Sequence, residues 1–276
     1  MFPRLFQVGD FSMPTYGVLL SLAVIMGLWI SRRNCQLQGI DSRKARKLGT
    51  LVVVSGIFGA KLLGIVLSWS FYSGHPQEVF GLVALRSGGV FYGGLLCAFL
   101  VGLCYVLANN MPTLATSDAS APGIALGHAI GRIGCFAAGC CWGKPTEAFW
   151  GVTFRDPLAH EWAGTLLAAP LVPTQLLDSV VEFTNFFFLM WLFRRKTLPG
   201  QVTGAYFVLY GFARYWMEYL RGDPGRGSVL GGALSVTQLI SIVMFVIGTL
   251  LWLRRSPSIH VPRINASGLA RDCTFD

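Results

Sequence analysis

Charged and polar residues recur at helical spacing within apolar sequence near the C-terminal end of the chain. Tyr210, Arg214, Glu218 and Arg221 are separated by four, four and three residues, which places their side chains on one face of a helix. A pair between Arg214 and Glu218 alone would make a membrane helix tolerable, but it would leave the other two side chains without a role. Because charged residues within a membrane span are functional candidates by default, we expect this face to line a site.

A further arginine, Arg132, lies in the middle of the stretch GHAIGRIGCFAAGCCWG, with His128 one turn before it. Asp178 and Glu182 follow in a later apolar segment. Either carboxylate could balance Arg132 or Lys61, and for Glu182 we favour a structural ion pair between helices. A guanidinium group can bind phosphate through two parallel hydrogen bonds. The buried arginines therefore predict a site for an anionic ligand, and a phospholipid head group is the most economical choice because lipid already surrounds the protein.

The segment SGGVFYGGLL, residues 87–96, places two glycine pairs around Tyr92. A glycine-rich turn that opens a helix can present N–H groups to an anion such as phosphate. Glycine pairs in membrane helices more often allow close packing, so this segment is a weak indication of a binding site by itself.

The composition indicates an all-α integral membrane protein. Of the 276 residues, 53% are hydrophobic and 13% are charged, whereas a soluble domain carries about 25% charged residues. The net charge of +9 is attributed to basic cytoplasmic loops, and we expect no nucleic-acid partner.

Seven apolar runs approach the length of about 20 residues that a membrane-spanning helix needs. Basic residues concentrate in the loops after the first and fifth runs and in the C-terminal tail. The positive-inside rule then places the N-terminus outside and the C-terminus in the cytoplasm. We expect a single membrane domain, residues 1–276, with an outer-side loop at residues 142–172 and a cytoplasmic tail at residues 256–276. The predicted spans are residues 16–30, 50–71, 90–108, 121–139, 174–193, 203–219 and 236–253.

Seven scattered cysteines do not suggest a disulfide framework. Cys135, Cys140 and Cys141 are close in sequence, but a zinc site needs a fourth ligand, and His128 is the only nearby candidate. We therefore expect packed thiols, with no metal and no other cofactor. A disulfide between the neighbouring Cys140 and Cys141 is disfavoured.

Five of these stretches, in order along most of the chain, resemble the prolipoprotein diacylglyceryl transferase family of bacterial membrane enzymes. Its motifs read Y-G, GG-x-x-F-H-GGL, G-R-x-G-N-F-x-x-G-E-x-x-G, H-P-[ST]-Q-L-Y-E and Y-G-x-x-R-x-x-x-E-x-x-R. The corresponding segments here are residues 16–17, 88–95, 131–143, 173–176 and 210–221.

The resemblance implies an enzyme of the bacterial cytoplasmic (inner) membrane. It would transfer the diacylglyceryl group of phosphatidylglycerol to the lipobox cysteine of a prolipoprotein signal peptide and release glycerol 1-phosphate. By correspondence with the family, the catalytic residues would be Arg132, Arg214 and Tyr92. The substrate-binding residues would be Tyr16, Gly93, Gly94, Cys135, Gly143, Gln175, Tyr210, Glu218 and Arg221.

The chain departs from the family motifs at several positions. Tyr92 stands where the family has a histidine that has been proposed as the base, and a phenol is a poor general base at neutral pH. We expect Tyr92 to orient a substrate, which leaves activation of the thiol to the field of the arginines. His128 is an alternative base, although a lone helix histidine is more often a structural hydrogen-bonding group. The remaining departures are Cys135 for asparagine, Cys140 for glutamate, Val172 for histidine and Leu177-Asp178 for the Tyr-Glu end of the fourth motif.

Two other functions fit the same residues. One is a phospholipid-binding homologue that has lost catalysis, which the substitutions at Tyr92 and Cys140 favour. The other is a transporter or channel for an anionic solute, in which the arginines line a pathway. The chain lacks the repeated halves typical of transporters, which counts against the second.

Overall fold

The computed structural model describes residues 2–8, 11–75, 77, 90–223, 227–229 and 232–254. Seven helices within these residues have 18 residues or more. They are α1 (Thr15–Leu37), α2 (Ser42–Leu67), α5 (Phe91–Ala108), α6 (Thr113–Ala138), α8 (Thr174–Arg195), α9 (Gln201–Leu220) and α10 (Val236–Leu253). Five of them, α1, α2, α5, α8 and α10, are long and apolar enough to cross a membrane. The prediction of a helical, multi-pass membrane protein is thereby confirmed.

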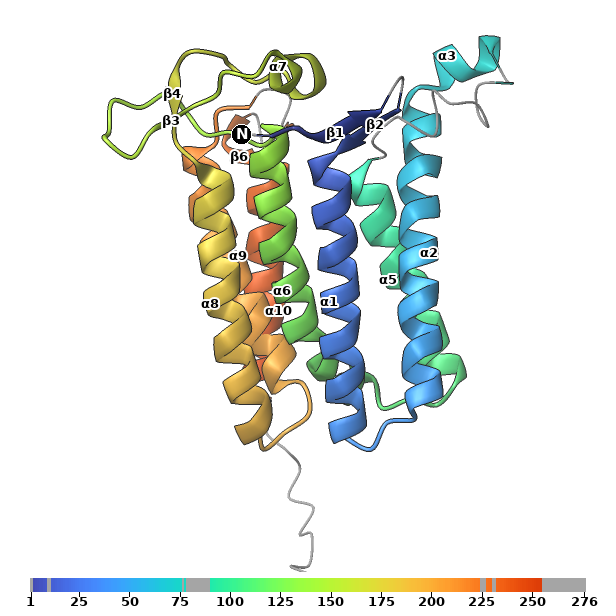
Figure 1. Ribbon diagram of the computed structural model, residues 1–276. Helices are drawn as coiled ribbons and strands as arrows, with labels where there is room; N and C mark the ends of the chain where they lie inside the picture. The colour runs from blue at the N-terminus through green and yellow to red at the C-terminus, as the bar shows by residue number, and fades with distance from the viewer. Residues whose placement is uncertain are drawn as a thin grey trace, which may run out of the picture.

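The short elements gather at one end of the helix bundle (Figure 1). Strand β1 (Arg4–Val8) pairs antiparallel with β2 (Phe11–Pro14) and leads directly into α1. The same end carries α3 (Trp69–Gly74), β3 (Val152–Thr153), α7 (Pro157–Ala163), β4 (Pro170–Leu171), β5 (Ser228–Val229) and β6 (Leu234–Ser235). The loops from α1 to α2 and from α8 to α9 lie at the opposite end.

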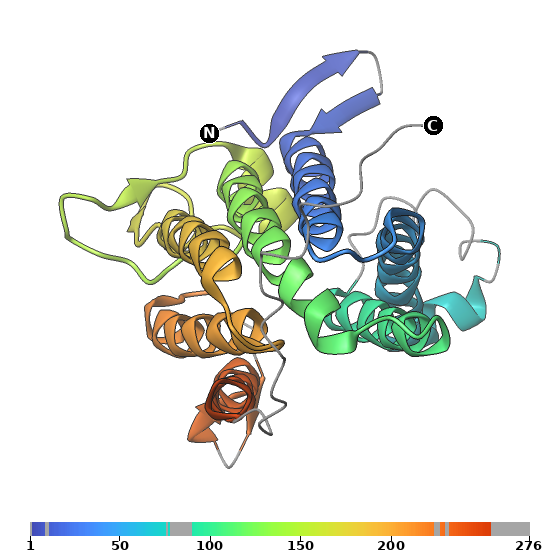
Figure 2. The same ribbon diagram turned by 90° about the horizontal axis from the view of Figure 1, so that it is seen from below.

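Helix α6 lies in the middle of the bundle, with α1 beside it (Figure 2). Helix α6 packs against α1, α8 and α9, while α2 packs against α5 and α9 packs against α10. The α1–α6 contact depends on glycine: a Cβ atom added at Gly123 would lie 2.4 Å from the carbonyl oxygen of Gly27. Small residues at such crossings let two backbones approach closely within a membrane.

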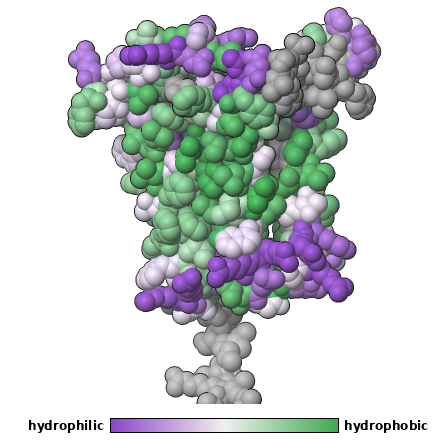
Figure 3. Space-filling view, in the orientation of Figure 1, coloured by the Kyte–Doolittle hydropathy of each residue, from purple (hydrophilic) through white to green (hydrophobic). Residues whose placement is uncertain are grey.

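The surface of the bundle is apolar between two hydrophilic ends (Figure 3). Large hydrophobic side chains such as Ile57, Phe99 and Phe187 are exposed on this band, which is the expected surface for contact with lipid. Arg32, Arg43 and other basic residues flank the α1–α2 loop, at the end of the bundle opposite to the short strands.

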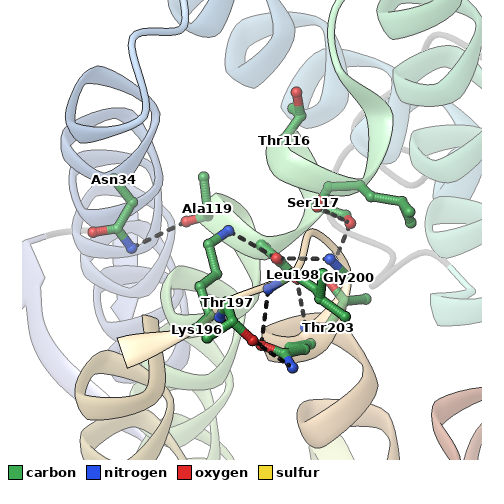
Figure 4. A network of polar contacts seen from close by, with 12 residues as sticks. Asn34, Thr116, Ser117, Ala119, Lys196, Thr197, Leu198, Gly200 and Thr203 are labelled. Carbon is green, nitrogen blue, oxygen red and sulfur yellow. Dashed lines mark hydrogen bonds and ion pairs between the residues drawn. The ribbon is translucent and has the colours of Figure 1, made fainter. Parts of the chain in front are cut away.

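A buried carboxylate fixes the α8–α9 loop against α6 (Figure 4). Asp118 is completely buried; it accepts hydrogen bonds from Lys196 Nζ and the Gly200 amide, both at 2.8 Å, and from the Thr203 amide at 2.9 Å. The same side chain therefore neutralises a lysine and satisfies amide groups at the start of α9, which have no partner within the helix.

Two helices begin eight residues before the predicted spans. Helix α2 begins at Ser42 rather than residue 50, and the Asp41 side chain caps it by accepting from the Arg43 amide at 2.7 Å. Helix α6 begins at Thr113 rather than residue 121, because the polar turn around Asp118 is buried and satisfied by the neighbouring loop. The length of an apolar run predicts only the part of a helix that contacts lipid. The helix itself can begin earlier, with polar residues in its first turns.

Candidate functional site

Arg132 joins α6 to α8. Its Nε atom lies 3.2 Å from Asp178 Oδ2 and 3.1 Å from His128 Nε2, to which it donates a hydrogen bond. The side chains of Arg132 and Asp178 are 12% and 8% exposed. Of the two partners left open by the sequence, Asp178 therefore contacts Arg132.

His128 lies between the arginine and a second carboxylate of α8. Its Nδ1 atom is 3.6 Å from Glu182 Oε1, and its ring centroid is 5.5 Å from that of Tyr210. Residues 128 and 132 on α6 thus face residues 178 and 182 on α8, each pair separated by one helical turn. The two ring nitrogens of His128 thus face Arg132 and Glu182, which favours a positioning role for this histidine.

Arg214 on α9 is the second buried guanidinium group. Its Nη2 atom lies 3.2 Å from Glu218 Oε2 one turn away. Its Nη1 atom is buried and has no hydrogen-bond partner among the described residues. An unpaired charged donor is costly to bury, so this nitrogen is suited to an anionic ligand.

Tyr210 lies one turn before Arg214 on α9. Its ring faces that of His128, which lies one turn before Arg132 on α6. Helices α6 and α9 are in direct contact. The ring contact between Tyr210 and His128 places this face of α9 against α6; that Arg132 and Arg214 share one site stays a prediction.

Gly143 and Arg221 meet where the loop after α6 crosses the end of α9. The two residues form a backbone bridge, and the Gly143 amide donates to the Val172 carbonyl at 3.1 Å. A Cβ atom at Gly143 would lie 2.5 Å from that oxygen, so the crossing admits only glycine. Arg221 donates through Nε and Nη2 to the two carboxylate oxygens of Asp223, at 2.8 Å and 2.7 Å.

Three cysteine side chains lie beside these arginines. The sulfur atoms of Cys135, Cys140 and Cys141 are all within 4.8 Å of one another, a spacing that could hold a metal ion. Hydrogen bonds from Cys135 and Cys140 lower the pKa of the Cys141 thiol below its usual range, and the positive charges of Arg221 and Arg132 act in the same direction.

The backbone carrying the cysteines is held by the start of α8. Gln175 is completely buried, and its Nε2 atom donates to the Cys140 carbonyl at 2.8 Å. The Thr174 hydroxyl donates to the Cys141 carbonyl, also at 2.8 Å. Tyr16, at the start of α1, packs against α6, since a Cβ atom added at Gly134 would lie 3.2 Å from its ring.

Tyr92 lies on α5, which carries neither of the two arginines. It is the second residue of α5, its side chain is 47% exposed, and its ring packs edge-on against Phe91. No hydrogen bond or ion pair in the described part of the chain joins it to Arg132 or Arg214. A role for Tyr92 beside the two arginines stays a prediction.

The glycines beside Tyr92 pack α5 against α2. A Cβ atom at Gly93 would lie 2.4 Å from the Gly59 carbonyl oxygen, and one at Gly94 would lie 2.8 Å from that of Gly56. Their close approach is explained by helix packing, and a role in substrate binding stays a prediction. The preceding part of the segment, residues 87–89, lies outside the described residues.

The side chains that hold the backbone of the site in place were not predicted from the sequence. The Thr174 hydroxyl and the Ser179 hydroxyl, which donates to the Ala129 carbonyl at 2.9 Å, carry no signal of their own because such residues are common. Asp223 did have a signal in the sequence, because an acidic residue two positions after Arg221 is a possible ion-pair partner.

Apolar helices around this cluster of guanidinium groups, carboxylates and thiols define a multi-pass membrane protein with a buried polar site. Comparison with known proteins identifies the family. Residues 3–254 match the family described as prolipoprotein diacylglyceryl transferase, and the chain belongs to it.

Curated relatives match along nearly their whole length. Phosphatidylglycerol–prolipoprotein diacylglyceryl transferase 2 of Clostridium perfringens (strain 13 / Type A) is 35% identical over 240 residues, which are 86% of this chain and 89% of the relative. The phosphatidylglycerol–prolipoprotein diacylglyceryl transferase of Clostridium tetani (strain Massachusetts / E88) is 32% identical, over 90% of this chain and 95% of the relative.

Proposed function

We propose that the protein transfers the diacylglyceryl group of phosphatidylglycerol to the lipobox cysteine of prolipoprotein signal peptides, the first step of bacterial lipoprotein maturation. The cysteine sulfur attacks the glyceryl carbon, a C–S bond forms, and the C–O bond to the phosphate breaks with release of glycerol 1-phosphate. Membership of the family supports this reaction, and the names of the relatives include both substrates.

The buried Arg214 Nη1 atom, which has no hydrogen-bond partner among the described residues, carries the proposal structurally. Arg132 holds the lipid phosphate, and Arg214 stabilises the charge that develops on the leaving phosphate, because fixed donors aimed at developing charge lower the barrier. Tyr92 orients a substrate by hydrogen bonding. The other residues assigned to substrate binding are Tyr16, Gly93, Gly94, Cys135, Gly143, Gln175, Tyr210, Glu218 and Arg221.

The site opens to the outer half of the bacterial inner membrane. In this arrangement all seven long helices cross the membrane, the N-terminus and residues 142–172 lie outside, and the C-terminal tail, residues 256–276, lies in the cytoplasm. The basic loops α1–α2 and α8–α9 at one end of the bundle support this orientation. Arg132 and Arg214 both lie in the later half of helices that start from that end.

A phospholipid-binding homologue without catalysis is the second candidate. The exposed side chain of Tyr92 and the cysteine at position 140 favour it. An anion transporter is a weaker alternative because its only support is the buried charge.

Reconstitution separates the three functions. The purified protein, phosphatidylglycerol vesicles and a lipobox peptide are expected to yield a diacylglyceryl thioether by mass spectrometry, together with an equal amount of glycerol 1-phosphate. A peptide with serine in place of the lipobox cysteine is the control. Bound phosphatidylglycerol without product would favour the non-catalytic homologue, and solute flux across the vesicles would favour the transporter.

A further inference from the structure

The thiol groups of Cys135, Cys140 and Cys141 converge where α6 ends. Their sulfur atoms lie within 4.8 Å of one another, and the three residues are half-buried rather than enclosed. Tetrahedral zinc with Zn–S bonds of about 2.3 Å holds its sulfur ligands roughly 3.8 Å apart. Small side-chain rotations would therefore bring all three sulfur atoms to one zinc ion.

The backbone of the cluster is built to hold this arrangement. Cys141 has φ of 62°, a left-handed conformation that residues other than glycine rarely adopt. Hydrogen bonds from buried Gln175 and Thr174 to the carbonyls of Cys140 and Cys141 keep the chain in this conformation. The two neighbouring cysteines can thus both direct their sulfur atoms to the third.

The proposed reaction lacks a group to deprotonate the substrate thiol. Only a thiolate attacks carbon efficiently. Tyr92 is a phenol and therefore a poor base at neutral pH, and both nitrogens of His128 face Arg132 and Glu182. Another feature of the site has to generate the thiolate.

We propose that Cys135, Cys140 and Cys141 bind a zinc ion whose fourth position takes the lipobox cysteine of the prolipoprotein. The proposal rests on the proposed transferase function. Three protein ligands and one open position are the arrangement of catalytic zinc sites. The sequence predicted no metal because the chain itself offers no suitable fourth ligand. In this arrangement the substrate cysteine supplies that ligand.

The chemistry balances with zinc and water as the added components. The substrate sulfur displaces hydroxide from zinc, and the hydroxide leaves as water with the thiol proton. The zinc-bound sulfur then attacks the glyceryl carbon, and the electron pair of the broken C–O bond passes to the phosphate oxygen. The thioether product is a weaker zinc ligand than a thiolate, so it dissociates. Water takes its place and gives a proton to the released phosphate, which restores the hydroxide.

Neighbouring arginines offset the charge of the loaded site. Zinc with four thiolates carries a net charge of −2. Arg132 interacts electrostatically with Cys135 and Cys141, and Arg221 interacts with Cys141. The same positive charges lie close to where the phosphate departs, so thiol activation and phosphate binding share one electrostatic environment.

Cobalt substitution in the full-length protein tests the site. We expect one cobalt ion per chain with sulfur-to-cobalt charge-transfer absorption. The absorption is lost in Cys140→Ser and retained in Cys104→Ser, a matched control on the exposed side of α5. Adding a lipobox peptide is expected to shift the cobalt bands, and the serine peptide is expected to leave them unchanged. Circular dichroism establishes that each variant is folded.

Turnover of the zinc-loaded and chelator-treated wild-type protein completes the test. Removal of zinc is expected to lower turnover about 100-fold, the scale of a lost general base, and zinc restores it. Full turnover without zinc, no stoichiometric metal, or a disulfide between two of these cysteines would overturn the zinc site and leave the transferase intact. Cobalt bands that respond to the peptide, without any thioether product, would instead support the site and overturn the transferase.

Discussion

The Nε atom of Arg132 lies 3.2 Å from Asp178 Oδ2, and this contact joins α6 to α8 inside the membrane bundle. The guanidinium group is thereby held in place before any lipid binds. Its remaining donors are available to a second anion, since a guanidinium group carries five N–H groups in a fixed fork.

Asp178→Asn is expected to lower the free energy of unfolding in a lipid-dependent manner. Removing one partner of a buried ion pair costs about 3 kcal/mol, because the remaining charge is left uncompensated. Thermal unfolding in phosphatidylcholine nanodiscs should show this loss, and phosphatidylglycerol should reduce it by bringing phosphate to Arg132. Asp156→Asn, which removes a carboxylate charge but keeps the side-chain oxygen that caps α7, is the control with no lipid dependence. Equal losses in both lipids would show that Arg132 does not contact the head group.

Arg214→Lys is expected to reduce kcat about 100-fold while the affinity for phosphatidylglycerol changes little. Lysine keeps the charge but loses the planar fork, and one donor to a developing oxyanion is worth at least this factor. Steady-state kinetics over a range of lipid concentrations measures both quantities. Arg194→Lys, at an exposed position in the last turn of α8, should have neither effect. A change confined to KM would mean that Arg214 binds the ground state only.

Tyr92→Phe is expected to lower kcat by less than about tenfold. A true general base contributes 10²–10⁴, whereas a hydrogen bond that orients a substrate contributes less. The measurement is the initial rate of thioether formation at saturating phosphatidylglycerol. Complete loss of turnover with lipid binding intact would instead make Tyr92 essential to the chemistry.

Gly143→Ala is expected to disturb the crossing between the loop after α6 and the end of α9. The added Cβ atom would meet the Val172 carbonyl oxygen at 2.5 Å, so the backbone beside Arg221 has to move. We expect the free energy of unfolding to fall by about 2 kcal/mol. Turnover of the protein that remains folded should fall about tenfold or more. Gly74→Ala, where an added Cβ atom meets nothing within 4 Å, should behave as wild type. Unchanged turnover of folded Gly143→Ala would remove this crossing from the account of the site.

The sequence predicts well those features that depend on apolar length and local spacing. Five of the long helices carry enough apolar sequence to be recognised as membrane spans, and the one-turn spacing of Arg214 and Glu218 yields the observed ion pair. The start of α6 could not be predicted in this way. A charged residue such as Asp118 indicates the end of an apolar span, and only the structure shows that the α8–α9 loop donates hydrogen bonds to its carboxylate.

Contacts within the site that depend on tertiary packing also could not be predicted from the sequence. Arg132 pairs with Asp178 rather than Glu182 because of the register between α6 and α8. That register depends on how the two helices pack and cannot be predicted from the sequence of either helix alone. The convergence of Cys135 with Cys140 and Cys141 depends on the left-handed conformation of Cys141 and on hydrogen bonds from α8. Neither feature has a local sequence signature.

A cryo-EM map of the protein in nanodiscs containing phosphatidylglycerol tests the central claim most directly. We predict density for a phospholipid head group in the outer half of the bundle, with its phosphate within hydrogen-bonding distance of both Arg132 and the Arg214 Nη1 atom. A phosphate bound elsewhere, with both guanidinium groups facing only protein, would contradict the proposed reaction site.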